Sequence, residues 1–154
     1  MTKKPSYLGL LNAIAYGEGE GAEYLSAWAA VTIDPDVQRA LRTVVAREAE
    51  HAAAFTKRLD ELGYEVLPRP NPDHAKRLRF AKSSKSDLEK LVRFGFDRDP
   101  ASPDIFDRMF NNHDLDVATG ALLGRYIAEE RDTVRLLHGL CRKLQRRAAA
   151  ANAA

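Results

Sequence analysis

The feature that most constrains the fold is an apolar stripe between Asp34 and Gly63 that an acid and an imidazole interrupt. Its apolar members, at the three- and four-residue spacing of one helix face, are Leu41, Val44, Phe55 and Leu59. Glu48 and His51 are three residues apart and fall on this same face. A buried carboxylate without a partner costs several kcal/mol. We therefore expect a metal ion, an arginine or a proton to neutralise Glu48 in the interior.

The rest of the chain also indicates helices, and no segment shows convincing strand alternation. Asp34 can cap the helix that follows it, Pro35 fits the first helical position, and Gly63 is a typical stop. A preceding helix over 6–31 is predicted from the apolar positions Leu8, Leu11, Ala15, Ala22, Leu25 and Ala29. Further helices are predicted from Ser86, over 103–110, and over 114–146, the last with the inward positions Leu122, Leu123, Ile127, Glu130, Val134, Leu137 and Leu144.

A long connection over 64–85 separates the second helix from the third. It holds Pro68, Pro70 and Pro72 and several basic residues, which we interpret as a solvated loop. Ser86 and Glu89 form a capping-box pattern, so Glu89 is assigned a local role. This order predicts an all-α chain: a four-helix bundle with a long crossover between the second and third helices and a broken third helix.

Size and composition favour one domain and exclude some partners. The 154 residues suit a single domain over 1–147, with an Ala-rich tail at 148–154 that we expect to be disordered. A net charge of +2 argues against a nucleic-acid partner. No apolar run is long enough for a membrane span, and the single Cys141 is compatible with a cytoplasmic location.

Counting from the first turn brings an acid of the first helix level with Glu48 and His51. Glu20 lies 13 residues before Ile33 and Glu48 lies 14 residues after Asp34, which is ~20 Å along either helix. Antiparallel packing therefore predicts that Glu20, Glu48 and His51 meet. The flanking Glu18 and Glu23 remain alternatives if the register differs. Gly17, Gly19 and Gly21 would allow close helix contact or leave space beside such a site.

A Glu on one helix followed by Glu-x-x-His on the next resembles the first half of a ferritin-like di-metal carboxylate protein. The segments EGEGAEYL and REAEHAAAF are similar to those of cyanobacterial aldehyde-deformylating oxygenases and, more loosely, rubrerythrins. The resemblance covers residues 8–63. It implies a ferritin-like bundle that binds iron, or alternatively manganese.

The second half of the chain departs from that family pattern. The family would supply a Glu from the third helix and a second Glu-x-x-His from the fourth. Glu130 is suitably placed, but Thr133 stands where a histidine would be. Glu129-x-x-Asp132 is an alternative acidic pair, and Asp97 or Asp99 are candidates from the third helix.

The predicted metal ligands are therefore Glu20, Glu48, His51 and Glu130, holding one or two ions. The resemblance implies an oxidoreductase or oxygenase that acts with O2 or peroxide on a small-molecule substrate, which we do not identify. Assembly into a homo-oligomer such as a dimer is left open. The alternative is a metal-free helical bundle with a degenerate site, acting as a scaffold or oligomerisation module, in which Arg125 or Arg131 pairs with the acids.

Overall fold

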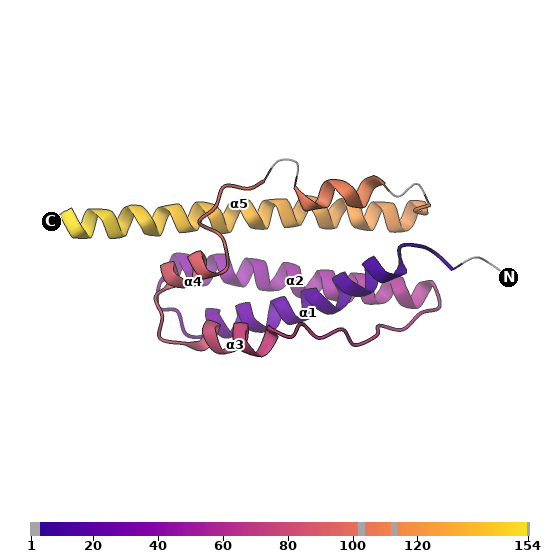
Figure 1. The fold of residues 1–154 in the computed structure, drawn as a ribbon, viewed down its shortest axis with the longest axis horizontal. Coiled ribbons are helices and arrows are strands. Elements are labelled where there is room, and N and C mark those ends of the chain that lie inside the picture. Colours follow the sequence, from indigo (N-terminus) through magenta and orange to yellow (C-terminus); the bar gives the residue numbers. More distant parts are fainter. Residues whose placement is uncertain (1–3, 102–103, 112–113, 154) are drawn as a thin grey trace.

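The computed structural model describes residues 4–101, 104–111 and 114–153, and every regular element in these ranges is a helix. The chain is therefore all-α, as predicted. The elements are α1 (Leu8–Ala29), α2 (Pro35–Glu61), α3 (His74–Lys82), α4 (Asp87–Arg93), the 3₁₀ helix η1 (Ile105–Asn111) and α5 (Val117–Ala153). Figure 1 shows that α1, α2 and α5 are the long helices and that α5 runs the length of the molecule.

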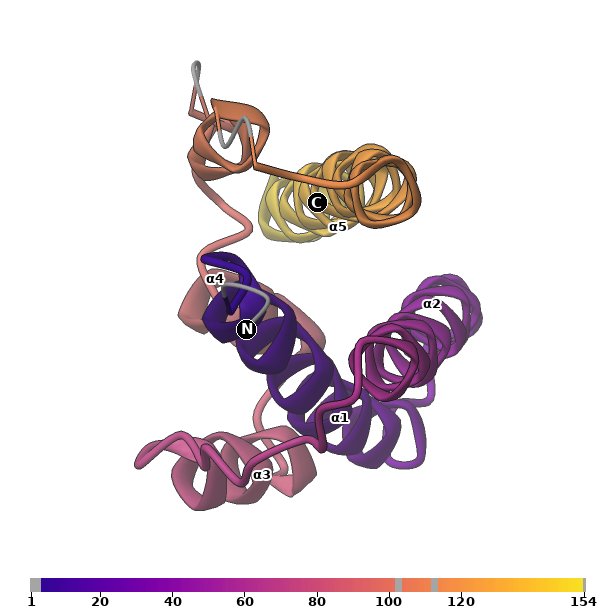
Figure 2. The ribbon, with the colours of Figure 1, turned by 90° about the vertical axis from the view of Figure 1, so that its right-hand side faces the viewer.

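The three long helices form the body, and the short ones cover parts of it. α1 and α2 are antiparallel and make the most extensive contact between two elements. Seen end-on in Figure 2, α5 lies above this pair and α3 lies on its far side, beneath α1. Both α4 and η1 contact α5. They do so at separate points along it (Figure 1).

The predicted start and end of α2 are confirmed. The Asp34 carboxylate accepts hydrogen bonds from the backbone N–H of Asp36, at 2.8 Å, and of Val37, at 3.2 Å, with Pro35 in the first turn. Gly63 adopts φ +81° just after the helix, a conformation that glycine reaches without strain. The capping box of Ser86 and Glu89 also forms, which accounts for Glu89.

Two segments differ from the sequence prediction. The expected loop 64–85 contains α3, because its run of Ala, Arg, Lys and Leu after Asp73 favours helix. The Ala-rich tail, expected to be disordered, continues α5 to Ala153, since alanine has the highest helix propensity. Its residues 148–153 are exposed. The short helix expected over 103–110 is the 3₁₀ helix η1, and Pro103 lies outside the described residues.

The core consists of two apolar clusters at opposite ends of the body. One joins the end of α1, the start of α2 and the second half of α5, around Leu25, Trp28, Leu41, Val44, Leu137 and Cys141. The other joins the opposite ends of these helices, around Leu11, Ile14, Phe55, Leu59, Leu123 and Ile127. In all three helices the residues between the two clusters include acids. The fold thus holds a polar layer between two apolar ones, and the candidate site is in that layer.

Candidate metal centre

The acid that α1 contributes to this layer is Glu18, and the prediction of Glu20 is wrong. The Glu20 carboxylate instead accepts hydrogen bonds from the backbone N–H of Asn71, at 3.1 and 3.2 Å. Leu11, Glu18 and Leu25 are seven residues apart and share one helix face. Both leucines are buried, so Glu18 points inward, whereas Glu20 is two positions around the helix. The flanking alternative named from the sequence therefore supplies the contact.

His51 lies at the centre of the polar layer, where carboxylates from two other helices surround it. Its side chain is 3% exposed. Nδ1 lies 3.2 Å from Oε2 of Glu18 on α1 and 3.5 Å from Oε1 of Glu130 on α5. Nε2 lies 2.6 Å from Oε2 of Glu129. From sequence, Glu129 is a candidate only in an alternative acidic pair with Asp132. The structure brings Glu129 to His51 and pairs Asp132 with Arg47, at 2.6 Å.

Glu48 lies against α1, where Gly21 makes room for it. A Cβ at position 21 would stand 1.9 Å from Oε2 and 3.1 Å from Cδ of Glu48, whereas one at Gly17 or Gly19 would meet nothing within 4 Å. Only Gly21 of these three therefore has a packing role. Burial raises the pKa of Glu48 to about 8, and the charges of Glu18 and Glu130 add to the increase. Glu48 is thus the carboxylate of the layer whose ionisation is most opposed.

Glu130 contributes a buried oxygen that has no hydrogen-bond donor. Its Oε1 is the one buried side-chain polar atom, among the described residues, without a hydrogen-bond partner. The nearest cationic atom is Nδ1 of His51, 3.5 Å away. Buried polar atoms are nearly always paired in folded proteins. An orphaned carboxylate oxygen beside an imidazole and a second carboxylate is therefore an atom that a bound cation could satisfy.

The protonation states follow from the crowding of negative charge. Burial opposes the charge on His51, but the three carboxylates around the ring, those of Glu130, Glu18 and Glu129, outweigh it and raise its pKa to about 10. Burial also raises the pKa of Glu18, although the hydrogen bond with His51 opposes this. Among the described residues, the imidazolium of His51 is therefore the positive charge that contacts these acids.

No arginine among the described residues pairs with Glu18, Glu48 or Glu130. Arg125 bonds Glu129 and Glu50 on the outer side of His51. Arg131 points away and bonds Asp104 and Asp107. The arginines considered from the sequence as neutralising groups therefore leave the inner three acids to a single imidazolium.

The remaining candidates separate into those that join the site and those that do not. The Tyr126 hydroxyl donates a hydrogen bond to Oε1 of Glu18 at 3.0 Å. Its position four residues before Glu130, on the same helix face, is the sequence signal for this contact. Asp97 and Asp99 are both exposed, and Asp99 instead pairs with His138 and Arg142, each at 3.3 Å. Within 4–101, 104–111 and 114–153, no ligand from α4 enters the layer.

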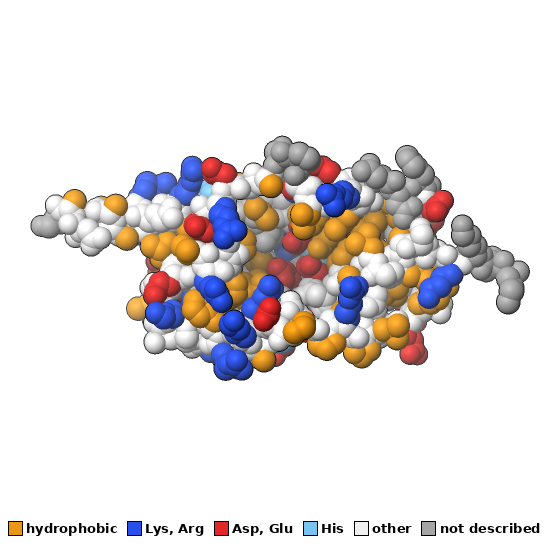
Figure 3. Space-filling view, viewed as in Figure 1, with side chains coloured by type: hydrophobic (Ala, Val, Ile, Leu, Met, Phe, Trp, Pro, Cys, Tyr) orange, Lys and Arg blue, Asp and Glu red, His pale blue; other side chains and the backbone are white. Residues whose placement is uncertain are grey.

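Two triads can offer a metal ligand atom from each residue. Ligand atoms of Glu18, His51 and Glu130 lie within 4.8 Å of one another, and so do those of Glu50, His51 and Glu129. The first triad joins α1, α2 and α5 and has its two carboxylates only 12% and 14% exposed. The second lies further out and already holds Arg125. The first is the better candidate. Figure 3 shows acidic side chains in the hollow between α5 and the α1–α2 pair.

Comparison with known proteins adds no family. No protein-family model matches the sequence, no curated protein matches it, and no solved structure matches it. None of the helices in the described part of the chain is long and apolar enough to cross a membrane.

Proposed function

We propose that this chain is a ferritin-like metal-carboxylate protein, in which iron or manganese bound between α1, α2 and α5 supports an oxidoreductase reaction with O2 or peroxide. In this proposal the three long helices fill three positions of a four-helix bundle, and α4 with η1 shares the fourth. The ligand set is Glu18, His51 and Glu130, with Glu48 adjacent. The substrate is a small molecule that we do not name.

The observation that carries this proposal is the orphaned Oε1 of Glu130. It faces the Nδ1 of His51 at 3.5 Å, and Glu18 faces the same nitrogen at 3.2 Å. Carboxylate oxygens with an imidazole nitrogen form a donor set that iron and manganese accept. A divalent cation would satisfy Glu130, replace the proton on Nδ1, and balance acids that one imidazolium balances only in part.

The other residues of the layer suit supporting roles around such an ion. Bound iron or manganese would supply one-electron redox chemistry at this position. With Nδ1 used as a ligand, Nε2–H of His51 donates to Glu129 at 2.6 Å, which fixes the ring orientation and the tautomer. The Tyr126 hydroxyl holds Oε1 of Glu18 and leaves Oε2 directed at the centre. The apolar clusters on both sides limit the access of water to the inner carboxylates, which are only 12% and 14% exposed.

The second candidate function, a metal-free scaffold, is favoured by one specific observation. His51 as an imidazolium contacts Glu18, Glu129 and Glu130 at once, so the layer is held together without a metal ion. In this case the layer is a structural ion cluster that specifies how three helices pack. The two functions differ in what removal of His51 does to metal content.

Metal analysis of protein purified with added Fe(II) or Mn(II) tests the proposal. We expect about one ion per chain at neutral pH, and tighter binding as the pH rises, because His51 must give up its proton to bind the ion. Glu18→Gln, Glu130→Gln and His51→Ala should each lower the bound metal by at least about ten-fold.

Glu20→Gln is the matched control on the same helix. Because Glu20 bonds Asn71 and not His51, this variant should keep its metal content. Wild-type protein without stoichiometric metal would favour the scaffold, and metal that persists in His51→Ala would show that the ion binds elsewhere. Either result would refute the proposed centre.

A further inference from the structure

A second site lies outside the acidic layer, where α3, α4 and the end of α1 meet. The cavity has a volume of about 320 Å³, which is within the range of small-molecule sites. Its lining combines aromatic rings with cations: Tyr24, Asp73, Lys76, Arg77, Phe80, Arg93, Phe94 and Phe96. None of these residues is a candidate metal ligand, so the cavity is a separate feature of the molecule.

The floor of this cavity is a cluster of stacked and edge-on aromatic rings. Phe94 is central: its ring centroid lies 5.1 Å from that of Tyr24, stacked, and 5.9 Å from that of Phe80, edge-on. Phe80, Phe94 and Phe96 are only partly buried. Aromatic side chains gain from complete burial and from ring contacts. Three that remain partly open around one hollow offer a surface for a further flat ring.

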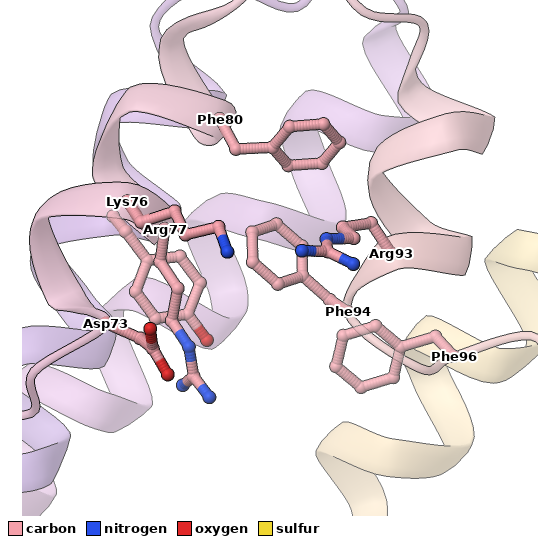
Figure 4. Close-up of a pocket in the computed structure, with 8 residues that line it drawn as sticks. Asp73, Lys76, Arg77, Phe80, Arg93, Phe94 and Phe96 are labelled. Carbon is pink, nitrogen blue, oxygen red and sulfur yellow. The ribbon is translucent and has the colours of Figure 1, made fainter.

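The rim of the cavity carries cations that form no ion pair within the described part of the chain. Neither Lys76, Arg77 nor Arg93 forms a salt bridge or a side-chain hydrogen bond with another described residue. Figure 4 shows Lys76 from α3 and Arg93 from α4 extending toward one another over Phe94. Asp73 is the single acid of the lining, so the rim has an excess of two positive charges.

We propose that this cavity binds a small organic anion that joins an aromatic ring to a carboxylate or phosphate group. The ring lies on Phe94 and is flanked by Phe80 and Phe96. The anionic group lies between Lys76 and Arg93, where charge-assisted hydrogen bonds from both sides hold it. An anion is required because the ligand must balance the cations of the rim, and an aromatic body is required because rings form the floor.

Calorimetric titration of the full chain with four matched compounds tests both requirements. 3-Phenylpropionate and phenyl phosphate carry ring and charge, 3-phenylpropanamide carries the ring alone, and inorganic phosphate carries the charge alone. We expect the two aromatic anions to bind at least about ten-fold more tightly than either of the other compounds. The tighter of the two aromatic anions identifies the anionic group as a carboxylate or a phosphate.

Surface variants on the two short helices assign the binding to this cavity. Arg93→Ala and Lys76→Ala should each weaken binding of the better anion by about ten-fold, since each removes one charged hydrogen-bond donor. Arg79→Ala is the control, because Arg79 is exposed on the same helix as Lys76 and does not line the cavity. All three changes remove exposed or rim charges and are expected to leave the fold intact.

Three results would overturn the proposal. Equal affinity for the amide would remove the anion requirement, and equal affinity for inorganic phosphate would remove the aromatic one. Equal losses in Arg79→Ala and Arg93→Ala would show general attraction to a basic surface. Metal content does not enter any of these measurements, so this test and that of the metal centre have independent outcomes.

Discussion

At the scale of single residues, Glu48 shows how the acidic layer affects stability. Its pKa is raised to about 8 by burial and by the neighbouring acids. A carboxyl group whose pKa is higher in the folded state binds its proton more tightly there. The stability of the folded state is therefore lost as the pH rises from the unfolded pKa toward about 8.

We predict that Glu48→Gln relieves this effect in the metal-free protein. The stabilisation by glutamine should grow by about 2 kcal/mol between pH 6 and pH 9, because the wild type must ionise a buried group and the variant does not. Urea denaturation in the presence of a chelator measures this difference. The exposed Glu65→Gln serves as control and should show no such trend. A difference that stays constant with pH in Glu48→Gln would contradict the raised pKa.

Single residues also show which features of the site sequence displays and which it does not. Sequence places Glu48 and His51 on one apolar helix face directly, because both residues interrupt a stripe that recurs at helical spacing. Glu20 was chosen by counting along straight antiparallel helices, which gives height along the axis but not rotation about it. The spacing of seven residues between Leu11, Glu18 and Leu25 places all three on one face of α1 and so favours Glu18 as the inward acid.

At the scale of one element, α1 carries glycines with different roles, and substitution separates them. Gly19→Ala should stabilise the protein by about 0.5–1 kcal/mol, because alanine favours helix and its Cβ meets nothing within 4 Å. Gly21→Ala should displace the Glu48 carboxylate, which lies 1.9 Å from the new Cβ position. Thermal unfolding and metal titration together measure both effects.

For these two variants we expect opposite outcomes in metal binding. Gly19→Ala should keep the affinity of the wild type, whereas Gly21→Ala should weaken it, since the displaced carboxylate must move toward the other ligands. Unchanged metal affinity in Gly21→Ala would show that Glu48 takes no part in the centre.

The start of α5 depends on Asp116, which replaces the predicted start at Asp114. Its carboxylate accepts hydrogen bonds from the backbone N–H of Thr119 at 2.9 Å, the Tyr7 hydroxyl at 2.6 Å and Arg58 at 2.8 Å. Burial opposes its ionisation, but the hydrogen bonds from Thr119, Tyr7 and Arg58 outweigh burial and hold the pKa of Asp116 well below its usual range.

We predict that Asp116→Ala lowers the free energy of unfolding by about 1–2 kcal/mol at pH 7, the range for a helix cap. A depressed folded pKa contributes stability above the unfolded value of 3.8, and this contribution is lost as the pH falls through the folded pKa. The difference between variant and wild type should therefore narrow below about pH 4. Urea titrations at pH 7 and pH 3 measure it, and an equal loss at both would assign the effect to packing alone.

Elements were predicted well where capping and stop residues mark their ends. They were predicted poorly where contacts with other helices stabilise them. Asp34, Pro35 and Gly63 are local signals, and α2 follows them closely. α3 has only nine residues and no side-chain cap, so little in its sequence distinguishes it from a loop. Its contact with α1, through the buried Ala81 and neighbouring side chains, accounts for it.

At the scale of the whole molecule, the periodicity of the sequence predicts helices throughout. It does not predict that the apolar residues form two clusters with a polar layer between them. Each long helix has apolar residues at both ends and polar ones between them, which sequence shows helix by helix. That the polar segments meet at one level depends on how α5 lies over the α1–α2 pair (Figure 2). No local pattern specifies this crossing, and so the meeting of Glu129 with His51 could not be read beforehand.

The far end of α5 gives a prediction about how much of the chain the fold needs. Arg147 bonds Asp34 at 3.0 Å and Asp36 at 2.7 Å, which ties α5 to the turn between α1 and α2. The residues after it are exposed. Deleting residues 148–154 should therefore change the free energy of unfolding by no more than about 0.5 kcal/mol.

Deleting residues 143–154 should lower it by about 2 kcal/mol or more, because this also removes the buried Leu144 and both cations that bond Asp36. Urea denaturation compares the two truncations, and circular dichroism reports the helix lost in each. If the shorter deletion destabilised the protein as much as the longer one, the tail would have to make contacts of its own, for instance with another copy of the chain. Because such contacts form between molecules, the loss of stability would then depend on protein concentration. Losses caused by the intramolecular ion pairs of Arg147 would not depend on it.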